Sequence, residues 1–394
     1  MKHWWIFFLF FFLISSLRAE PLFFQPDDRV MILGDTLVQN TAYPIFLQQY
    51  IYTRHRNLNA HFFKQGWATD TTKALLERLE RDVLIEKPTV VLIHYGISDA
   101  GFNGIDWKKI KAFTENLNQI VTTLKKKNIR LVLIGLPCCD TDRNPQFLKV
   151  DQNTVFNMYN DVIRSIALSN QILYIDYFAD MQQDIKIKKQ KDPTFTLQPD
   201  GLHFDTKGSL YLLNKLLPRL GCSPQIPLAE LNIEEALIGH VAQQTPQGFK
   251  ITLTQSAPTP FWIPENSLDL AKEIGFLKRF GSRSLTIHGL PKNTTYQVTI
   301  DQAPAGIYTA AQLDAGIEAN ASQQLAPKLI HEWVTRKDMN YHVAWSDVRL
   351  HYANLPGGTR ILQALGIADE GFHEIILDLS PTQTRTVIEL SQTK

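Results

Sequence analysis

The hydrophobic and polar positions of this chain follow two periodic patterns, and the chain changes from one pattern to the other near residue 222. From residue 27 to about residue 220, short apolar runs alternate with longer segments in which apolar residues recur every three or four positions. Short apolar runs predict buried strands, and the longer segments predict amphipathic helices. Because strands and helices alternate, residues 27–222 are predicted to form a parallel sheet with helices on both faces.

Several predicted strands end in turns that carry glycine and polar residues. These turns are Gly34-Asp35-Thr36, Gly66 and Gly96-Ile97-Ser98-Asp99. In open parallel sheets, ligands bind beyond the carboxyl ends of the strands, so a site is expected at this edge. The predicted strands cover residues 30–33, 60–63, 90–93, 129–136 and 172–175, and the predicted helices cover residues 43–54, 69–82, 107–126, 155–168 and 208–217.

Beyond residue 222 prolines break the helical rhythm, and several segments alternate apolar and polar residues with period 2. Such segments are typical of half-buried antiparallel strands. One helix, roughly residues 324–345, is expected among them. Residues 223–394 are therefore predicted to form a smaller β-rich α+β domain of unknown role, with strands at residues 249–254, 284–287, 296–301 and 374–379.

The N-terminus has the pattern of a secretory signal peptide. Met1-Lys-His is followed by the apolar run Trp4–Ile14 and then by Ser15-Ser-Leu-Arg-Ala19. The run is shorter than the ~20 residues that span a membrane comfortably. We expect residues 1–19 to direct export to the periplasm or the medium, and the alternative is an uncleaved segment that anchors the protein to the membrane.

Composition limits the classes of partner. The chain has 394 residues, 44% of them hydrophobic, and 40 basic residues nearly balance 39 acidic ones. With a net charge of +1, the chain has no excess of basic residues of the kind that binds nucleic acid. The three cysteines form no disulfide framework and no zinc pattern, although one long-range bond from Cys222 to Cys138 or Cys139 stays open. Neither a metal nor a cofactor is expected.

A carboxylate and an imidazole stand three residues apart at Asp200 and His203. An ester hydrolase needs a hydroxyl nucleophile, a base for its proton and donors for the oxyanion. Asp200 is close enough to orient the His203 ring from the same loop, which makes His203 the strongest candidate base. Alone this pair is a weak signal, because a histidine on a loop is more often a surface residue.

The order of the motifs adds weight to the pair. Gly34-Asp35-Thr36, Gly66, Gly96-x-Ser98-Asp99 and Asp200-x-x-His203 resemble the four sequence blocks of the SGNH/GDSL hydrolases over residues 27–218. The resemblance implies a flavodoxin-like doubly wound sheet and an esterase or acetylesterase acting on small esters or acylated carbohydrates. It also implies that Thr36 is the nucleophile, that Asp200 and His203 are acid and base, and that Thr36, Gly66 and Ser98 form the oxyanion hole.

Two of these positions depart from the family pattern. Thr36 stands where the family has serine, and its extra methyl group restricts χ1 and crowds the attack. Ser98 stands where the family has asparagine and is shorter. Losing one oxyanion donor lowers the rate by about a hundredfold to a thousandfold, so a slow esterase is expected. Asp35 and Asp99 are expected to form turns by bonding nearby backbone N–H groups.

Two other hypotheses remain open from the sequence. A degenerate member of the family would keep the crevice and bind a glycan or acyl ligand without hydrolysing it. An interaction protein of the cell envelope would instead work through residues 223–394, where exposed aromatic residues would offer a carbohydrate platform, although such residues are more often part of a core or an interface. These aromatic residues are Phe261, Trp262, Trp333, Tyr341 and Trp345.

Overall fold

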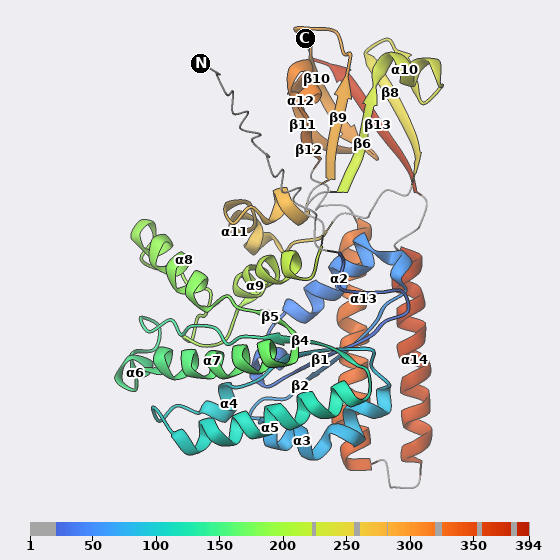
Figure 1. Ribbon diagram of the computed structural model, residues 1–394. Helices are drawn as coiled ribbons and strands as arrows, with labels where there is room; N and C mark the ends of the chain where they lie inside the picture. The colour runs from blue at the N-terminus through green and yellow to red at the C-terminus, as the bar shows by residue number, and fades with distance from the viewer. Residues whose placement is uncertain are drawn as a thin grey trace, which may run out of the picture.

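A parallel sheet with the strand order β2-β1-β3-β4-β5 forms the centre of the larger part of the protein (Figure 1). The computed structural model describes residues 21–222, 226–255, 261–281, 283–319, 325–352, 357–379 and 384–393. The predicted signal segment, residues 1–19, lies outside these residues. The order is that of the flavodoxin-like doubly wound sheets, so the predicted fold class is confirmed.

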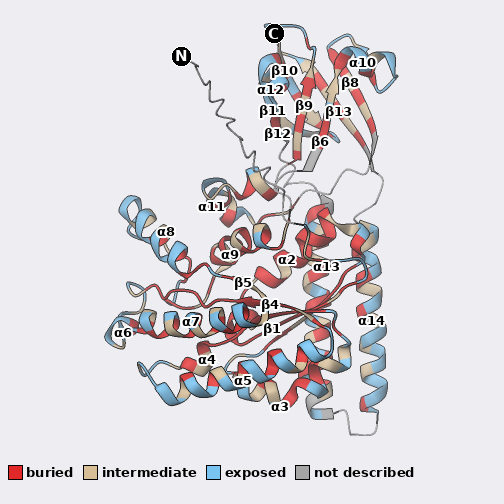
Figure 2. Ribbon diagram, in the orientation of Figure 1, coloured by how far each residue is buried: buried red, intermediate tan, exposed pale blue. Residues whose placement is uncertain are grey.

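The three inner strands of this sheet are short and almost fully buried, as their continuous apolar sequences predict. In Figure 2 the sheet is drawn almost entirely in the colour of buried residues. The strands are β1 (Arg29–Gly34), β2 (His61–Gly66), β3 (Val90–His94), β4 (Arg130–Ile134) and β5 (Leu173–Ile175). All their pairings are parallel, so their carboxyl ends meet at one edge.

Helices cover both faces of the sheet (Figure 1). On one side α5 packs against α3 and α7, and on the other α2 packs against α9. Polar side chains begin several of them: the Asp106 carboxylate accepts from two backbone N–H groups of α5, and Asp205 caps α9. The helices of this part are α1 (Thr36–Gln39), α2 (Tyr43–Arg54), α3 (Thr72–Arg78), α4 (Ile97–Ala100), α5 (Trp107–Lys126), α6 (Pro145–Lys149), α7 (Gln152–Asn170), α8 (Phe178–Lys191) and α9 (Thr206–Arg219).

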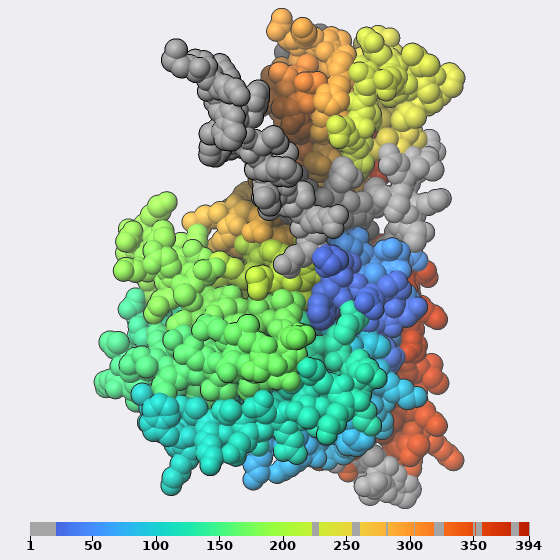
Figure 3. Space-filling view, in the orientation of Figure 1, coloured from blue at the N-terminus to red at the C-terminus, as the bar shows by residue number. Residues whose placement is uncertain are grey.

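A second, β-rich body stands above the α/β body (Figure 3) and has its own hydrophobic core. One of its sheets has the order β11-β10-β13-β8-β7 and the other has the order β12-β9-β6. The short helices α10 (Ile233–Ile238) and α12 (Ala310–Ala315) accompany them. The strands are β6 (Ile226–Asn232), β7 (Ala242–Thr245), β8 (Gly248–Gln255), β9 (Arg283–His288), β10 (Thr295–Ile300), β11 (Ala303–Thr309), β12 (Ile317–Ala319) and β13 (Thr384–Gln392).

The residues beyond 223 are shared between the two bodies. α11 (Leu268–Glu273), α13 (Leu325–His342), the π-helical segment η6 (Val343–Tyr352) and α14 (Gly358–Leu379) lie against the α/β body. Ile330, Val334 and Trp345 are 0% exposed and belong to the core of that body. A boundary at residue 223 therefore divides residues that form one core, because the chain leaves the α/β body and returns to it.

The helix pair α13 and α14 covers the edge strand β2. Lys337 donates from Nζ to the backbone carbonyl of Phe62 at 2.5 Å, and His61 Nε2 lies 2.6 Å from Asp369 Oδ2 of α14. An uncovered edge strand exposes unpaired backbone groups and invites association, so this cover is part of what stabilises the sheet.

Other expectations for the C-terminal residues are corrected. Residues 374–379, predicted as a strand, are the last turns of α14. The aromatic residues considered as a carbohydrate platform are buried or half-buried between the helices and the α/β body, and none of them is exposed. These residues are Phe261, Trp262, Trp333, Tyr341 and Trp345.

The three cysteines are buried and unpaired within the described part of the chain, so the disulfide left open by the sequence is not formed. No helix among the described residues is both long and apolar enough to cross a membrane.

Candidate active site

The candidate nucleophile begins a four-residue helix at the end of β1. Thr36 is the first residue of α1, and Asp35 is its N-cap. Gly34 has no room for a side chain, since an added Cβ would lie 2.1 Å from Val38 Cγ2 and 2.8 Å from the His94 carbonyl oxygen. The tight strand-to-helix turn therefore needs glycine here, and it presents Thr36 at the carboxyl edge of the sheet.

Asp35 ties the ends of β1 and β3 together. Its Oδ1 accepts from the Leu37 N–H at 3.0 Å, and its Oδ2 accepts from the N–H groups of Gly96, Ile97 and Ser98 at 3.0–3.3 Å. Full burial raises the pKa of Asp35 to about 6, although the hydrogen bonds from Leu37, Ser98 and Gly96 oppose the shift. The carboxylate thus builds two turns, as the sequence predicted, and fixes Ser98 relative to Thr36.

A hydrogen-bonded relay joins the three residues that the sequence proposed as catalytic. His203 Nε2 lies 2.7 Å from Thr36 Oγ1, and His203 Nδ1 lies 2.5 Å from Asp200 Oδ2. Asp200 also accepts from the backbone N–H groups of Leu202 and His203. Partial burial tends to raise the pKa of Asp200, but the hydrogen bonds from His203 and the backbone outweigh it and lower that pKa. The carboxylate is therefore ionised at neutral pH and is oriented toward the imidazole.

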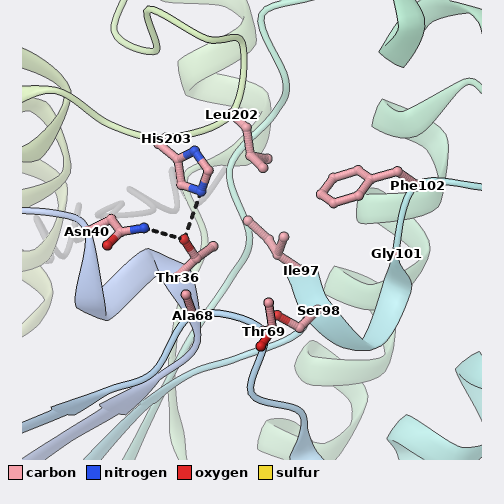
Figure 4. A pocket seen from close by; sticks show the side chains of 10 residues that line it. All are labelled: Thr36, Asn40, Ala68, Thr69, Ile97, Ser98, Gly101, Phe102, Leu202 and His203. Carbon is pink, nitrogen blue, oxygen red and sulfur yellow. Dashed lines mark hydrogen bonds between the residues drawn. The ribbon is translucent and has the colours of Figure 1, made fainter.

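Asn40 is a member of the site that the sequence analysis missed. Its Nδ2 donates to Thr36 Oγ1 at 2.9 Å, as Figure 4 shows. Asn40 is also the C-cap of α1. The spacing of four residues from Thr36 would have placed both side chains on one face of a helix, but a helix as short as α1 leaves no periodic signal in the sequence.

A cavity of about 420 Å³ opens beside the relay (Figure 4). Its walls are largely apolar, and His203 is the only lining residue of the described chain with an ionisable side chain. The lining residues are Thr36, Asn40, Ala68, Thr69, Ile97, Ser98, Gly101, Phe102, Leu202 and His203.

The structure brings Thr36, Ser98 and His203 into this cavity but not Gly66. Gly66 packs against α1, where an added Cβ would lie 2.3 Å from the Gln39 backbone nitrogen, and this close approach explains the glycine. Thr69, three residues later, lines the cavity and has a φ of +68°. Positive φ is unusual for a β-branched residue, so the backbone of Thr69 is strained where it forms part of the cavity wall. The backbone N–H groups of Thr36 and Thr69 have no acceptor among the described residues.

Buried charges hold the strained loop in place. The Asp70 carboxylate accepts from Arg78 at 2.7 Å and from the Tyr95 hydroxyl at 2.6 Å. Asp99 accepts from both the backbone and the hydroxyl of Thr72, so it joins two segments rather than bonding near neighbours. Burial raises the pKa of Asp99 to about 6 against these donors. The loop that carries Thr69 is thus fixed at both ends.

His94, the other histidine at the strand ends, does not reach the cavity. It is fully buried and lies within 3.2 Å of the Tyr43 and Tyr177 hydroxyls and the Gly135 carbonyl. Burial lowers its pKa to about 3. Its role is packing at the end of β3. No group of side chains suited to hold a metal ion occurs among the described residues.

The sheet order and the strand-end relay place this part of the chain among the α/β proteins that bind ligands at the carboxyl edge of the sheet. Residues 32–209 match the sequence model of the GDSL-like lipase/acylhydrolase family. The resemblance seen in the sequence is thereby confirmed.

The chain is also similar to individual proteins. The chain is 25% identical over 175 residues to the isoamyl acetate-hydrolyzing esterase of Saccharomyces cerevisiae, a match that covers 42% of this chain and 69% of that protein. Its fold is similar to that of a gut microbial diltiazem-metabolizing enzyme, with a TM-score of 0.73 and 19% identity over 94% of this chain and 98% of the other. An acetylxylan esterase from Geobacillus stearothermophilus matches 51% of this chain and 97% of its own, at 19% identity and a TM-score of 0.41.

Proposed function

We propose that this protein is an ester hydrolase that acts on small carboxylic or O-acyl esters, with Thr36 as its nucleophile. The observation that carries the proposal is the continuous relay from Asp200 through His203 to the Thr36 hydroxyl. A histidine held by a carboxylate on one side and a hydroxyl on the other is the arrangement that activates a hydroxyl nucleophile. The match of residues 32–209 to the sequence model of a lipase and acylhydrolase family supports the same reaction.

The reaction proceeds in two halves. His203 Nε2 takes the Thr36 proton while Oγ1 attacks the carbonyl carbon, and the resulting oxyanion is bound by the backbone N–H groups of Thr36 and Thr69 and by the Ser98 hydroxyl. His203 then gives its proton to the departing alcohol, which leaves an acyl ester on Thr36. His203 next takes a proton from a water molecule as the water oxygen attacks the acyl carbon. The bond between Thr36 Oγ1 and the acyl carbon then breaks, His203 returns the proton to Oγ1, and the carboxylic acid leaves.

The cavity supports a neutral, compact substrate. Its apolar walls include Ala68, Ile97, Phe102 and Leu202 and offer no charge to a charged acyl group. The name of the yeast relative points to an acetate ester. We therefore propose acetyl or similarly short acyl groups, carried on a small alcohol or a carbohydrate, and we propose that residues 1–19 direct the enzyme out of the cytoplasm.

Thr36→Ser is expected to raise kcat for p-nitrophenyl acetate by about tenfold. The substitution removes the methyl group that restricts χ1 and crowds the attack, and relief of about 1.4 kcal/mol in the barrier corresponds to that factor. Initial rates at saturating substrate measure the change. Thr53→Ser, which changes another buried threonine inside α2, serves as the control and is expected to leave kcat unaltered.

One alternative follows from the changes at Thr36 and Ser98. A protein that had lost the reaction would bind an acyl or glycan ligand in the same cavity without turnover. Absence of ester hydrolysis by both the wild type and Thr36→Ser, together with saturable binding, would establish that alternative and overturn the proposed hydrolase.

A further inference from the structure

The Thr36 hydroxyl contacts two side chains, and only one of them belongs to the expected relay. His203 Nε2 lies 2.7 Å from Oγ1, and Asn40 Nδ2 lies 2.9 Å from the same atom. In Figure 4 Asn40 approaches the hydroxyl from the side opposite Ile97 and Ser98. The Asn40 backbone N–H also donates to the Thr36 carbonyl at 3.0 Å. This hydrogen bond holds the backbone of residue 40 at the end of the helical turn that begins with Thr36.

The chemistry of the amide decides the direction of both hydrogen bonds. An amide nitrogen only donates, whereas a hydroxyl has one proton and two acceptor lone pairs. The Asn40 contact therefore occupies a lone pair of Oγ1 and leaves the single Thr36 proton for His203 Nε2. The other ring nitrogen, Nδ1, then carries its own proton toward Asp200.

We propose that Asn40 is a positioning residue that fixes the Thr36 hydroxyl with its proton directed at His203. The inference rests on the proposed function, since it assigns Asn40 a part in preparing that nucleophile. The Asn40 contact also explains how a threonine can act as the nucleophile at this position. The side-chain rotamer is held by two partners, so the methyl group cannot exchange places with the oxygen without breaking both hydrogen bonds.

Asn40→Asp tests this assignment because it nearly preserves shape while replacing a donor with an acceptor. The introduced carboxylate is expected to accept the Thr36 proton and to draw it away from His203. A hydrogen bond to a charged group contributes about 1.5–3 kcal/mol, so kcat for p-nitrophenyl acetate should fall roughly 10- to 100-fold at neutral pH with little change in KM. Asn40→Ala, which adds no charge, should lower kcat by up to about tenfold.

A second readout does not depend on activity. Asn40 Nδ2 and His203 Nε2 lie 2.9 Å and 2.7 Å from the same Thr36 oxygen, so a carboxylate at residue 40 would lie within about 6 Å of the His203 ring. A negative charge at that distance favours the protonated imidazole. In Asn40→Asp the His203 ring resonances should titrate at a pH roughly one unit above that seen in the wild type, and the acidic limb of the rate profile should move in the same direction. The resonances are assigned by their absence from His203→Ala.

The matched control is Asn170→Asp. Asn170 ends α7 and donates its amide to the Ile166 carbonyl, four residues earlier, at 2.9 Å. This variant should leave both kcat and the His203 titration unchanged. The inference is overturned if the His203 titration in Asn40→Asp coincides with that of the wild type, or if an active wild type keeps its kcat in that variant. If the wild type itself hydrolyses no ester, the proposed function fails, whereas an unshifted His203 titration in Asn40→Asp overturns the placement of Asn40 beside Thr36 and His203 whether or not the protein is active.

Discussion

His203→Ala is expected to lower kcat for p-nitrophenyl acetate at least about a thousandfold. His203 is the base that takes the Thr36 proton at 2.7 Å and the acid that returns it to the leaving alcohol, and no other imidazole lies within the described walls of the cavity. Removing one member of such a relay abolishes most of its effect, because the members act as a unit. Initial-rate measurements on the purified full chain determine the loss.

His240→Ala is the control for this prediction. His240 is exposed in the β-rich body and has no part in the relay, so its removal should leave turnover intact. Equal turnover by the wild type and His203→Ala would show that any ester hydrolysis arises elsewhere on the protein.

A chain restricted to residues 21–222 is expected not to fold into the native α/β body. It lacks α13, η6 and α14, which bury Ile330, Val334 and Trp345 in the core and cover β2. Large apolar side chains contribute about 2 kcal/mol each on burial, so losing several of them removes an amount comparable with the ~5–15 kcal/mol that stabilises a whole domain. Near-ultraviolet circular dichroism and cooperative urea unfolding report the outcome.

A chain restricted to residues 21–379 separates the helix pair from the β-rich body. It keeps α13 and α14 but lacks β13, which pairs with both β10 and β8 in the middle of its sheet. This variant should lose the β-rich body and retain ester turnover. A cooperative, active 21–222 chain would contradict the role assigned to the helix pair.

The parts of the site that the sequence predicted are those fixed by local pattern. Buried strands are continuous apolar runs, so the ends of β1 and β3, and with them Thr36 and Ser98, are visible without coordinates. Asp200 and His203 share one loop, where an Asp-x-x-His spacing already allows the carboxylate to reach the ring. The α/β fold follows from the same alternation.

The parts that were missed depend on contacts between distant segments or on backbone conformation. Thr69 lines the cavity with a positive φ, a conformation that a threonine in the sequence does not predict. The sequence placed Gly66 in the oxyanion hole, whereas its lack of a side chain allows the end of β2 to pack closely against α1. Residues 374–379 alternate as a strand would, yet they continue a helix whose buried stripe, including His373 and Ile376, meets the α/β body.

The most direct test of the central claim is covalent labelling of the nucleophile. A fluorophosphonate reacts with a hydroxyl that a neighbouring base has activated, and peptide mass spectrometry identifies the residue that carries it. We expect one adduct, on Thr36, formed by the wild type and absent from His203→Ala. An adduct on Ser98, or labelling of Thr36 that persists without His203, would contradict it.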